Sequence, residues 1–295
     1  MSTVTGATRL TQISPGRKRK DRIMRGSLLA GTGIALVPLI LVIYYLIDKG
    51  VSSWSASGFF TTDPTGSFFG NPGGIRSAIF GTLEIVALAS LIAIPIGIAV
   101  ALYLTEYGKD GRFANVVRYF VDVMTGVPSV VFGLFIYITL VISHAGGSGF
   151  AGWKGSLALS LLMLPIVIRS AEVVLLLVPS SLREAALALG APRWRIVWRV
   201  VLPTARSGLV TGSLLAVARG MGETAPLLFT VSLATAFTGN IDGLMNSLPL
   251  QIYTDITNPR DVIVARAWGA ALTLVALVLI LNVTARLISR RSSMR

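Results

Sequence analysis

Residues 178–203, V-P-S-S-L-R-E-A-A-L-A-L-G-A-P-R-W-R-I-V-W-R-V-V-L-P, decide how the rest of the chain is organised. The stretch lies between two long apolar segments, yet it is rich in positive charge. Its arginines are Arg183, Arg193, Arg195 and Arg199. Its first half predicts a short helix over residues 182–189, and its second half predicts another short helix that ends at Pro203. We therefore expect the chain to leave a membrane, fold a small helix-turn-helix at its surface and enter the membrane again.

Single residues mark the ends of these two helices. Ser181 and, three residues later, Glu184 match a capping box at the start of the first helix. Gly190 can adopt the left-handed conformation that closes a helix, and Pro192 suits the first turn of the next one. A surface helix this small is typical of an element that fits a groove in a partner protein, with an ordinary amphipathic surface loop as the alternative.

The composition indicates an integral membrane protein. Of 295 residues, 53% are hydrophobic and 13% are charged, which is about half the charged fraction of a typical soluble domain. There is no cysteine, and the single histidine is His144 in a glycine-rich loop, so we expect no disulfide, no metal centre and no cofactor. The net charge of +13 would suggest nucleic acid in a soluble protein. Here the basic residues gather in loops, which predicts a lipid bilayer and no nucleic acid as the partner.

The expected fold is all-α, a polytopic membrane bundle with six transmembrane helices, because six apolar segments are each long enough to cross a bilayer. These segments cover residues 27–47, 77–104, 116–142, 155–178, 205–235 and 264–288. The expected organisation is a disordered basic tail (1–26), a first membrane helix (27–47), an external loop (48–76), a core (77–288) that contains the loop 179–203, and a second basic tail (289–295). In the third segment, Pro128 and Ser129 predict a kink or break. A polar, turn-rich loop is expected at 236–261.

The distribution of lysine and arginine predicts the orientation. With a cytoplasmic N-terminus, seven of them precede the first segment, three lie in the second loop, five surround the loop 179–203 and four close the chain. These nineteen face the cytoplasm, five face outside, and two lie inside the membrane. The positive-inside rule therefore predicts that both termini and the loop 179–203 are cytoplasmic.

The two intramembrane arginines are Arg169 and Arg219. An arginine at the bilayer centre costs about 2.5–3.5 kcal/mol even on a lenient scale, so each should face the bundle interior. At about 1.5 Å per residue, both lie roughly 15–20 Å from the loop 179–203, near the membrane midplane. A guanidinium group donates two parallel hydrogen bonds to an oxyanion. We therefore expect a passage that favours an anion.

A purely structural role for the two arginines is the alternative. Glu172 follows Arg169 by three residues and Glu223 follows Arg219 by four, so each pair can form on one helical face. The two roles can also combine, since a carboxylate that holds the arginine ready also keeps the empty site from trapping its ligand.

The central stretch resembles the EAA loop of ABC-importer membrane subunits, whose pattern is EAA-x3-G-x9-I-x-L-P. The matching residues are Glu184, Ala185, Ala186, Gly190, Leu202 and Pro203. Val200 stands where the family usually has isoleucine, a difference of one methylene. The resemblance implies a type I ABC importer-like fold in which the first short helix is a coupling helix that docks into a cytoplasmic ATPase.

Two further segments resemble phosphate ABC-transporter permeases. Residues 218–227, A-R-G-M-G-E-T-A-P-L, resemble the family segment A-R-x-x-G-E-T-A-P-L, and residues 126–135, G-V-P-S-V-V-F-G-L-F, resemble G-[VI]-P-S-[VI]-V-[YF]-G. E-T-A-P-L and the run A-R-A-W-G-A-A at 265–271 are more similar to the PstA-type subunit than to its PstC-type partner. We place these residues in the substrate path: Arg169, Arg219, Glu223, Pro128 and Ser129.

The resemblance implies a phosphate importer with several subunits. The partners would be a PstC-like second permease, two copies of a PstB-like ATPase and a PstS-like extracytoplasmic phosphate-binding protein. The sequence has no G-x-x-x-x-G-K-[ST] motif, so ATP hydrolysis would belong to a separate subunit and this chain would be a transport subunit rather than an enzyme. The alternatives are a permease for another oxyanion, such as sulfate or molybdate, and a phosphate-sensing membrane component without flux.

Overall fold

The computed structural model describes residues 15–65, 72–109, 111–147 and 149–293, and helices dominate that part of the chain. Residues 1–14, which hold the first half of the expected basic tail, lie outside the described residues. The chain divides into two units, residues 1–48 and 49–295, and each is considered separately below.

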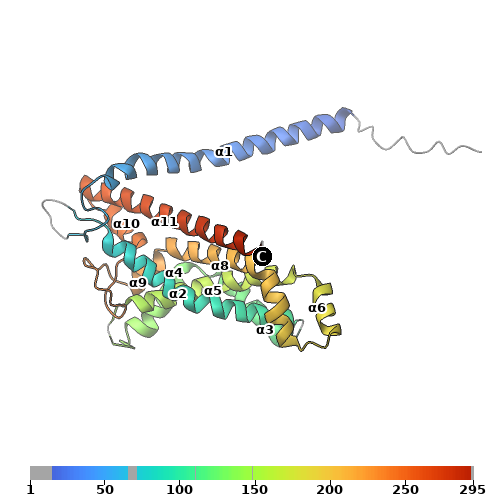
Figure 1. Ribbon diagram of the computed structural model, residues 1–295. Coiled ribbons are helices and arrows are strands. Elements are labelled where there is room, and N and C mark those ends of the chain that lie inside the picture. Colours follow the sequence, from blue (N-terminus) through green and yellow to red (C-terminus); the bar gives the residue numbers. More distant parts are fainter. Residues whose placement is uncertain (1–14, 66–71, 110, 148, 294–295) are drawn as a thin grey trace, which may run out of the picture. The chain divides into compact units, whose positions relative to one another are not determined.

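Helix α1 (Pro15–Trp54) begins in the first unit and ends in the second (Figure 1). The expected membrane helix 27–47 lies within it. The predictions of a disordered tail up to residue 26 and of a loop from residue 48 are wrong for the described residues, because the helix covers both flanks. Lysine and arginine are good helix formers, so the basic flank continues the helix. In the second unit, Trp54 Nε1 donates to Thr273 Oγ1 at 3.0 Å and so fixes the end of α1.

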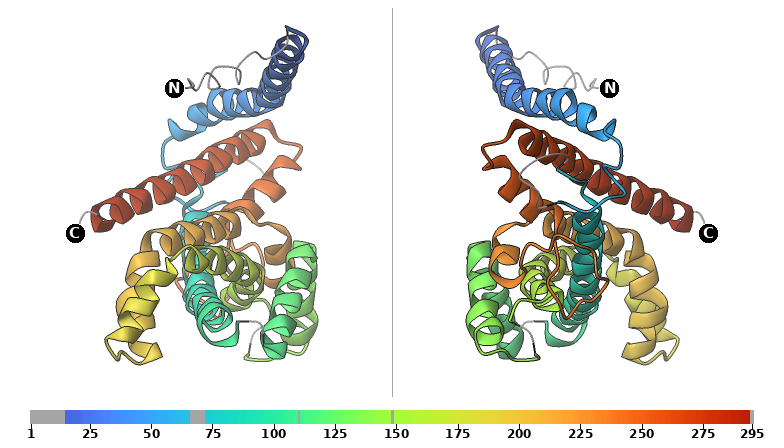
Figure 2. Two further views of the ribbon diagram at one scale, coloured as in Figure 1. Left: turned by 90° about the vertical axis from the view of Figure 1, so that its right-hand side faces the viewer. Right: turned by 90° about the vertical axis from the view of Figure 1, so that its left-hand side faces the viewer.

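Four long helices form the centre of the second unit: α2 (Arg76–Leu102), α5 (Gly152–Leu176), α8 (Leu202–Gly222) and α11 (Asp261–Ser293) (Figure 2). Small residues let the helix backbones approach closely, which drives packing when lipid replaces water outside. A Cβ at Gly212 of α8 would lie 2.6 Å from Ser170 Oγ of α5, and one at Gly97 of α2 would lie 2.6 Å from a Val167 methyl group. Glycine at these positions therefore sets the distance between helices. The expected tail from 289 is part of α11, which runs to Ser293.

Among the described residues, five helices are long and apolar enough to cross a membrane, and a bent pair would make a sixth span. The bent pair consists of α3 (Arg112–Gly126) and α4 (Ser129–Ile136), which a π-helical turn extends to Val141. The two halves meet at 101°. The predicted break at Pro128 is confirmed, because the residue before a proline is pushed out of the helical region and Val127 is extended, with φ −74° and ψ 129°.

Two predictions for the fifth segment are wrong. The chain does not end a second short helix at Pro203, because α7 (Arg193–Ile196), a π-helical turn (Val197–Val201) and α8 follow one another without a break. Pro203 is the second residue after the π-helical turn, at the point where the chain returns to α-helical geometry. The segment also does not continue as one helix to residue 235. It opens at Glu223, which is extended, and resumes as α9 (Ala225–Thr230).

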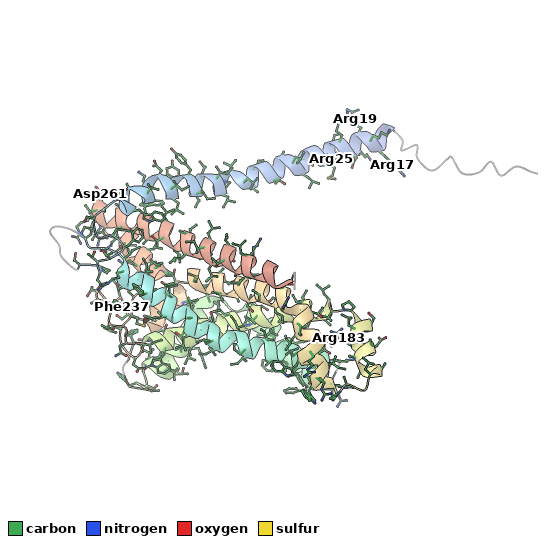
Figure 3. The ribbon with its side chains drawn as sticks, viewed as in Figure 1. Arg17, Arg19, Arg25, Arg183, Phe237 and Asp261 are labelled. Atoms are coloured by element: carbon green, nitrogen blue, oxygen red, sulfur yellow. The ribbon has the colours of Figure 1, made fainter. Side chains whose placement is uncertain are left out.

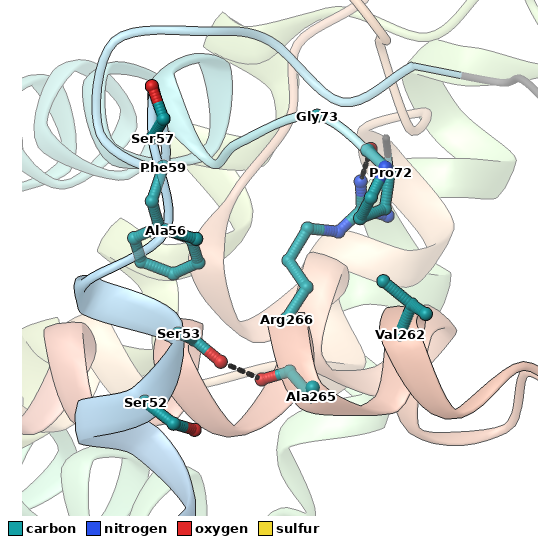
Figure 4. Close-up of a pocket in the computed structure, with 10 residues that line it drawn as sticks. All are labelled: Ser52, Ser53, Ala56, Ser57, Phe59, Pro72, Gly73, Val262, Ala265 and Arg266. Atoms are coloured by element: carbon teal, nitrogen blue, oxygen red, sulfur yellow. Dashed lines mark hydrogen bonds between the residues drawn. The ribbon is translucent and has the colours of Figure 1, made fainter. Parts of the chain in front are cut away.

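The expected loop 236–261 contains a helix that the sequence did not predict, α10 (Leu248–Ile256). Pro249 lies in its first turn, where it starts a helix rather than breaks one. Asp255 of α10 and Arg266 of α11 form a buried ion pair of 2.7 Å, each side chain only 6% exposed. Arg266 also donates to the Pro72 carbonyl and lines a cavity of about 460 Å³ (Figure 4). Asp255 balances the charge of Arg266. Through its contacts with Asp255 and Pro72, Arg266 joins α11 to α10 and to the segment before α2.

Candidate functional site

Helix α6 (Ser180–Ala188) is the short helix that the sequence predicted at the surface, and none of its residues is buried. It lies at the end of the bundle opposite α10 (Figure 1), and Figure 3 labels its residue Arg183. Glu184 and Ala185 are exposed. Three leucines of this region are exposed as well, Leu182, Leu187 and Leu189. An exposed helix with apolar side chains on its surface is a form that suits a partner's groove.

Gly190 closes α6 as the sequence predicted. Its φ is +74°, and it lies in a Schellman motif: Gly190 N–H donates to Leu187 O at 2.9 Å and Ala191 N–H donates to Ala186 O at 3.1 Å. The predicted capping box is wrong, because the helix begins at Ser180, two residues earlier than expected. Pro179 is the N-cap residue and no side chain caps the helix.

Arg183 attaches α6 to two membrane helices. Its guanidinium group donates to Glu106 Oε1 at 2.8 Å, in the π-helical turn (Tyr103–Gly108) that continues α2. It also donates to Leu175 O at 2.9 Å and Val178 O at 2.7 Å, where α5 ends. The cation therefore satisfies carbonyl groups that a helix C-terminus leaves without partners.

Part of the EAA loop packs against the helix bundle. Ala186, Val200 and Leu202 contact a buried apolar cluster that includes Leu175 and Val201, whereas Pro203 is exposed. One face of the loop is thus fixed to the bundle, and the other, with Glu184, is open. A small pocket of about 210 Å³ between Glu106, Glu184 and Arg193 lies beside it.

Arg169 belongs to a group of four charged side chains, which we call the Arg169 cluster: Arg118, Asp122, Arg169 and Glu172. Arg169 donates to Glu172 Oε2 at 2.8 Å and to Asp122 Oδ1. Arg118 Nε donates to Glu172 Oε1 at 2.8 Å. Glu172 is only 7% exposed and lies between the two guanidinium groups. The predicted pairing of Arg169 with Glu172 is therefore confirmed.

The sequence reasoning missed Arg118 and Asp122. They lie on α3, 54 and 47 residues away from their partners on α5, so no local spacing could reveal the pairs. The available signal was Asp122 itself, because an ionisable residue within an apolar segment is a functional candidate. Arg118 was counted among the loop residues. In the structure it bonds Leu104 O at 3.0 Å and Lys109 O at 2.7 Å and joins α3 to the end of α2.

A groove of about 620 Å³ lies beside the Arg169 cluster, between α5 and α8. Its polar lining consists of Arg169, Ser170, Ser207 and Thr211. Gly208 and Gly212 also line it. One cation and three hydroxyl groups thus share an open groove.

Arg219 lies near the end of α8 and is less tightly held. Its Nε is 3.4 Å from Glu223 Oε1, and its side chain is 61% exposed, against 32% for Arg169. The predicted pairing with Glu223 is confirmed, although the helix ends between the two residues and Glu223 itself is extended. Opening of the helix beside Arg219 leaves the guanidinium group accessible.

The packing of α5 against α8 gives the relative depth of the two arginines. Gly212 lies against Ser170, and Gly220 lies against Met163, so the helices run antiparallel and Arg169 is level with about residue 213. Arg219 lies six residues further along α8, which at 1.5 Å per residue is about 9 Å. The arginines therefore occupy successive levels of the bundle, with Arg219 further from α6.

The two phosphate-permease-like segments meet in the structure. A Cβ on Gly133 of α4 would lie 2.6 Å from Pro226 Cα of α9, so only glycine permits this crossing. Pro128 is exposed at the break before α4, and Ser129 is half-buried at its first position. The broken span α3–α4 and the broken span α8–α9 therefore cross each other, and their contact lies close to both breaks. Interrupted helices at membrane depth are tolerated where they are buried in protein or line a passage.

These features define a multi-pass membrane transport subunit: a bundle with interrupted spans, charged groups inside it and an exposed docking helix. The chain belongs to the family of binding-protein-dependent transport system inner membrane components, whose model matches residues 93–294. It is therefore a permease subunit of an ABC transporter that works with an ATPase and a binding protein.

Curated relatives agree with this family. The chain is 43% identical over 259 residues to phosphate transport system permease protein PstA 1 of Mycobacterium tuberculosis (strain ATCC 25618 / H37Rv), covering 86% of this chain and 82% of that protein. It is 38% identical over 273 residues to the protein of Haemophilus influenzae with the name phosphate transport system permease protein PstA, covering 92% and 94%.

Solved structures share the fold. A chain of a bacterial alginate ABC transporter, in complex with an alginate-bound periplasmic protein, is similar with a TM-score of 0.63 at 17% identity, covering 92% of this chain and 96% of that one. A chain of the MetNI methionine ABC transporter in an inward-facing conformation has a TM-score of 0.59 at 20% identity, covering 74% and 94%. These similarities confirm the helical importer fold.

Proposed function

We propose that the chain is the membrane-spanning subunit of an ATP-driven importer of inorganic phosphate, and that Arg219 binds the anion in passage. The observation that carries the proposal is an exposed guanidinium group at the opening between α8 and α9. It lies within the segment 218–227, which resembles phosphate permeases. Phosphate carries about −1.5 to −2 charge at pH 7, and a guanidinium group offsets part of its desolvation through bidentate hydrogen bonds.

The substrate path that we propose contains Arg169 and Arg219 at successive levels, with Glu223 beside the second. Pro128 and Ser129 contribute the break that opens the bundle opposite α9. Glu223 holds the Arg219 guanidinium group in place while no anion is present and lowers its affinity for one. A moderate affinity favours flux, because a deep binding well would stall transport.

The partners that we propose are a PstC-like second permease, two PstB-like ATPase subunits and a PstS-like phosphate-binding protein. The second permease would complete the path by covering the open groove between α5 and α8. The lipid bilayer surrounds the spans. We place both termini and α6 in the cytoplasm, because the positive-inside distribution favours that orientation.

We further propose that α6 couples the permease to its ATPase. ATP binding closes the ATPase dimer and moves α6, and Arg183 transmits that movement to α2 through Glu106 and to α5 through the Leu175 carbonyl. Because α7 continues into α8 without a break, α8 moves together with the end of the bundle that carries α6. The movement changes which side of the bundle is open.

The first test is uptake of labelled phosphate in phosphate-starved cells that lack this chain. The wild-type chain should restore uptake, and unlabelled phosphate but not sulfate or molybdate should compete. If sulfate competes equally, another oxyanion is the substrate. If the wild-type chain restores nothing while the ATPase still co-purifies, a sensing role without flux is favoured.

The coupling role is tested with changes in the EAA loop. Glu184→Lys reverses the exposed charge and should abolish uptake in a protein that still inserts, whereas Glu184→Gln should be milder. Gly190→Ala introduces about 1–2 kcal/mol of left-handed strain and should reduce uptake. The matched control is Gly239→Ala at the opposite end, also with positive φ (+64°) and room for a methyl group. Equal loss in both alanine variants, or normal uptake with Glu184→Lys, would contradict the coupling role.

A further inference from the structure

Arg169 has two carboxylate partners that differ in their surroundings. Glu172 is 7% exposed and Asp122 is 62% exposed. Glu172 is also bound by Arg118 Nε. Arg118 in turn is fixed by two backbone carbonyl groups. The Glu172 carboxylate is therefore fixed inside the bundle, whereas the Asp122 carboxylate is mostly exposed.

Charge balance separates the two carboxylates further. Arg118, Arg169 and Glu172 together carry a charge of +1, which the Asp122 carboxylate neutralises. Asp122 lies on α3, whereas Arg169 lies on α5 beside the open groove. A pair between two helices can separate without unfolding either one, and the Asp122 side chain, which is 62% exposed, is not held in place by surrounding packing.

We propose that Asp122 is a releasable counter-ion of Arg169 that competes with the transported oxyanion for the guanidinium group. This inference rests on the proposed function. It makes Asp122 a positioning residue, because Asp122 acts on the anion through Arg169. An oxyanion on Arg169 and the Asp122 carboxylate repel each other, because like charges cannot share a site without cost. Asp122 therefore turns away from Arg169 when the anion arrives, and its return to Arg169 displaces the anion.

Glu172 cannot fill this role. Its movement would leave Arg118 without its carboxylate in a poorly solvated place, and loss of one partner from a buried pair is strongly destabilising. Asp122 can leave more easily because, among the described residues, its ion pair is with Arg169 alone, whereas Glu172 is paired with two cations. The cluster thus combines a fixed carboxylate that positions Arg169 with a mobile one that keeps the anion's residence short.

The test is inhibition of uptake by phosphate on the receiving side. The complete transporter, reconstituted in proteoliposomes with ATP, graded internal phosphate and external binding protein, is assayed for initial uptake. Asp122→Asn keeps an acceptor oxygen for Arg169 but removes the charge. It should lower the half-inhibitory internal phosphate concentration about fivefold, the factor that about 1 kcal/mol gives for a partly exposed pair. Asp122→Glu should restore the wild-type value.

The control is Asp261→Asn, which removes an exposed carboxylate from the first turn of α11. An unchanged half-inhibitory concentration in Asp122→Asn, or an equal shift in Asp261→Asn, would overturn the proposal. Failure of the Asp122→Asn complex to assemble would also overturn it, because Asp122 would then be structural. Absence of uptake by the wild-type complex would instead overturn the proposed function, and this inference with it.

Discussion

Arg169 and Arg219 are both arginines inside the bundle, but the structure holds them in different ways. Arg169 is bound by two carboxylates from two helices and is 32% exposed, whereas Arg219 has one partner on its own segment at 3.4 Å and is 61% exposed. The same residue type at successive levels of a membrane bundle can therefore do two kinds of work. Arg169 joins α3 to α5 and also lines the groove beside α8, whereas Arg219 is paired within its own segment and is the more accessible of the two.

The largest expected effect separates these two roles directly. Arg219→Gln should reduce phosphate uptake by about a hundredfold or more, since it removes the charge-assisted hydrogen bonds to the anion, yet the complex should assemble with an unchanged melting temperature. Arg169→Gln should reduce uptake and also lower the melting temperature, because Glu172 loses one of its two cations. Uptake and thermal unfolding of the purified complex measure both. If Arg219→Gln prevents assembly, Arg219 is a structural residue and the comparison fails.

A smaller effect is expected for the two glutamates. Glu172→Gln leaves two guanidinium groups without their shared anion, and loss of a partner from a buried pair typically costs about 3–5 kcal/mol. Glu223→Gln removes a longer and more accessible pair, for which about 0–1 kcal/mol is typical. Denaturation of the purified chain should therefore show a clear loss for Glu172→Gln and almost none for Glu223→Gln. Equal losses would mean that both arginines are held equally firmly.

The smallest effect concerns a reference pair outside the membrane, Asp63 and Arg76, whose atoms approach to 2.7 Å. The Arg76 guanidinium group lowers the pKa of Asp63 below its usual value of 3.8. Asp63 also accepts from Phe237 N–H at 3.2 Å. The pKa of Asp63 is lower in the folded than in the unfolded chain, so its pairing with Arg76 stabilises the folded state above pH 3.8. This contribution is lost as the pH falls through the folded-state pKa of Asp63.

Amide hydrogen exchange at Phe237 measures this loss. At neutral pH the Phe237 amide should exchange faster in Asp63→Asn than in the wild type. The ratio of the two exchange rates should approach one as the pH falls below the folded-state pKa of Asp63. The ratio cancels the intrinsic pH dependence of exchange. A constant ratio would show that the pair contributes nothing, which would sharpen the contrast with the buried Arg169 cluster.

Local chemistry made part of this architecture predictable from the sequence. Gly190 at the end of α6, Pro128 at the break of a span, and the pairing of each arginine with a glutamate follow from spacing and backbone preferences. Asp122 and Arg118 could not be found in this way, because their partners are distant in sequence. Two helical details were also missed: Pro203 lies within a continuous run of helical turns, and Pro249 lies in the first turn of a helix. Proline alone does not distinguish these positions from a helix stop.

The break at Val127 and Pro128 bears on how the chain enters the membrane during synthesis. The fifteen residues of α3 reach about 22 Å at 1.5 Å per residue, less than the roughly 30 Å of a bilayer's hydrocarbon core. Neither half is long enough to partition into lipid as an independent span. We therefore expect the two halves to become stable in the bilayer only together, once α5 supplies Glu172 for Arg118. Insertion of this third span is thus expected to depend on the fourth.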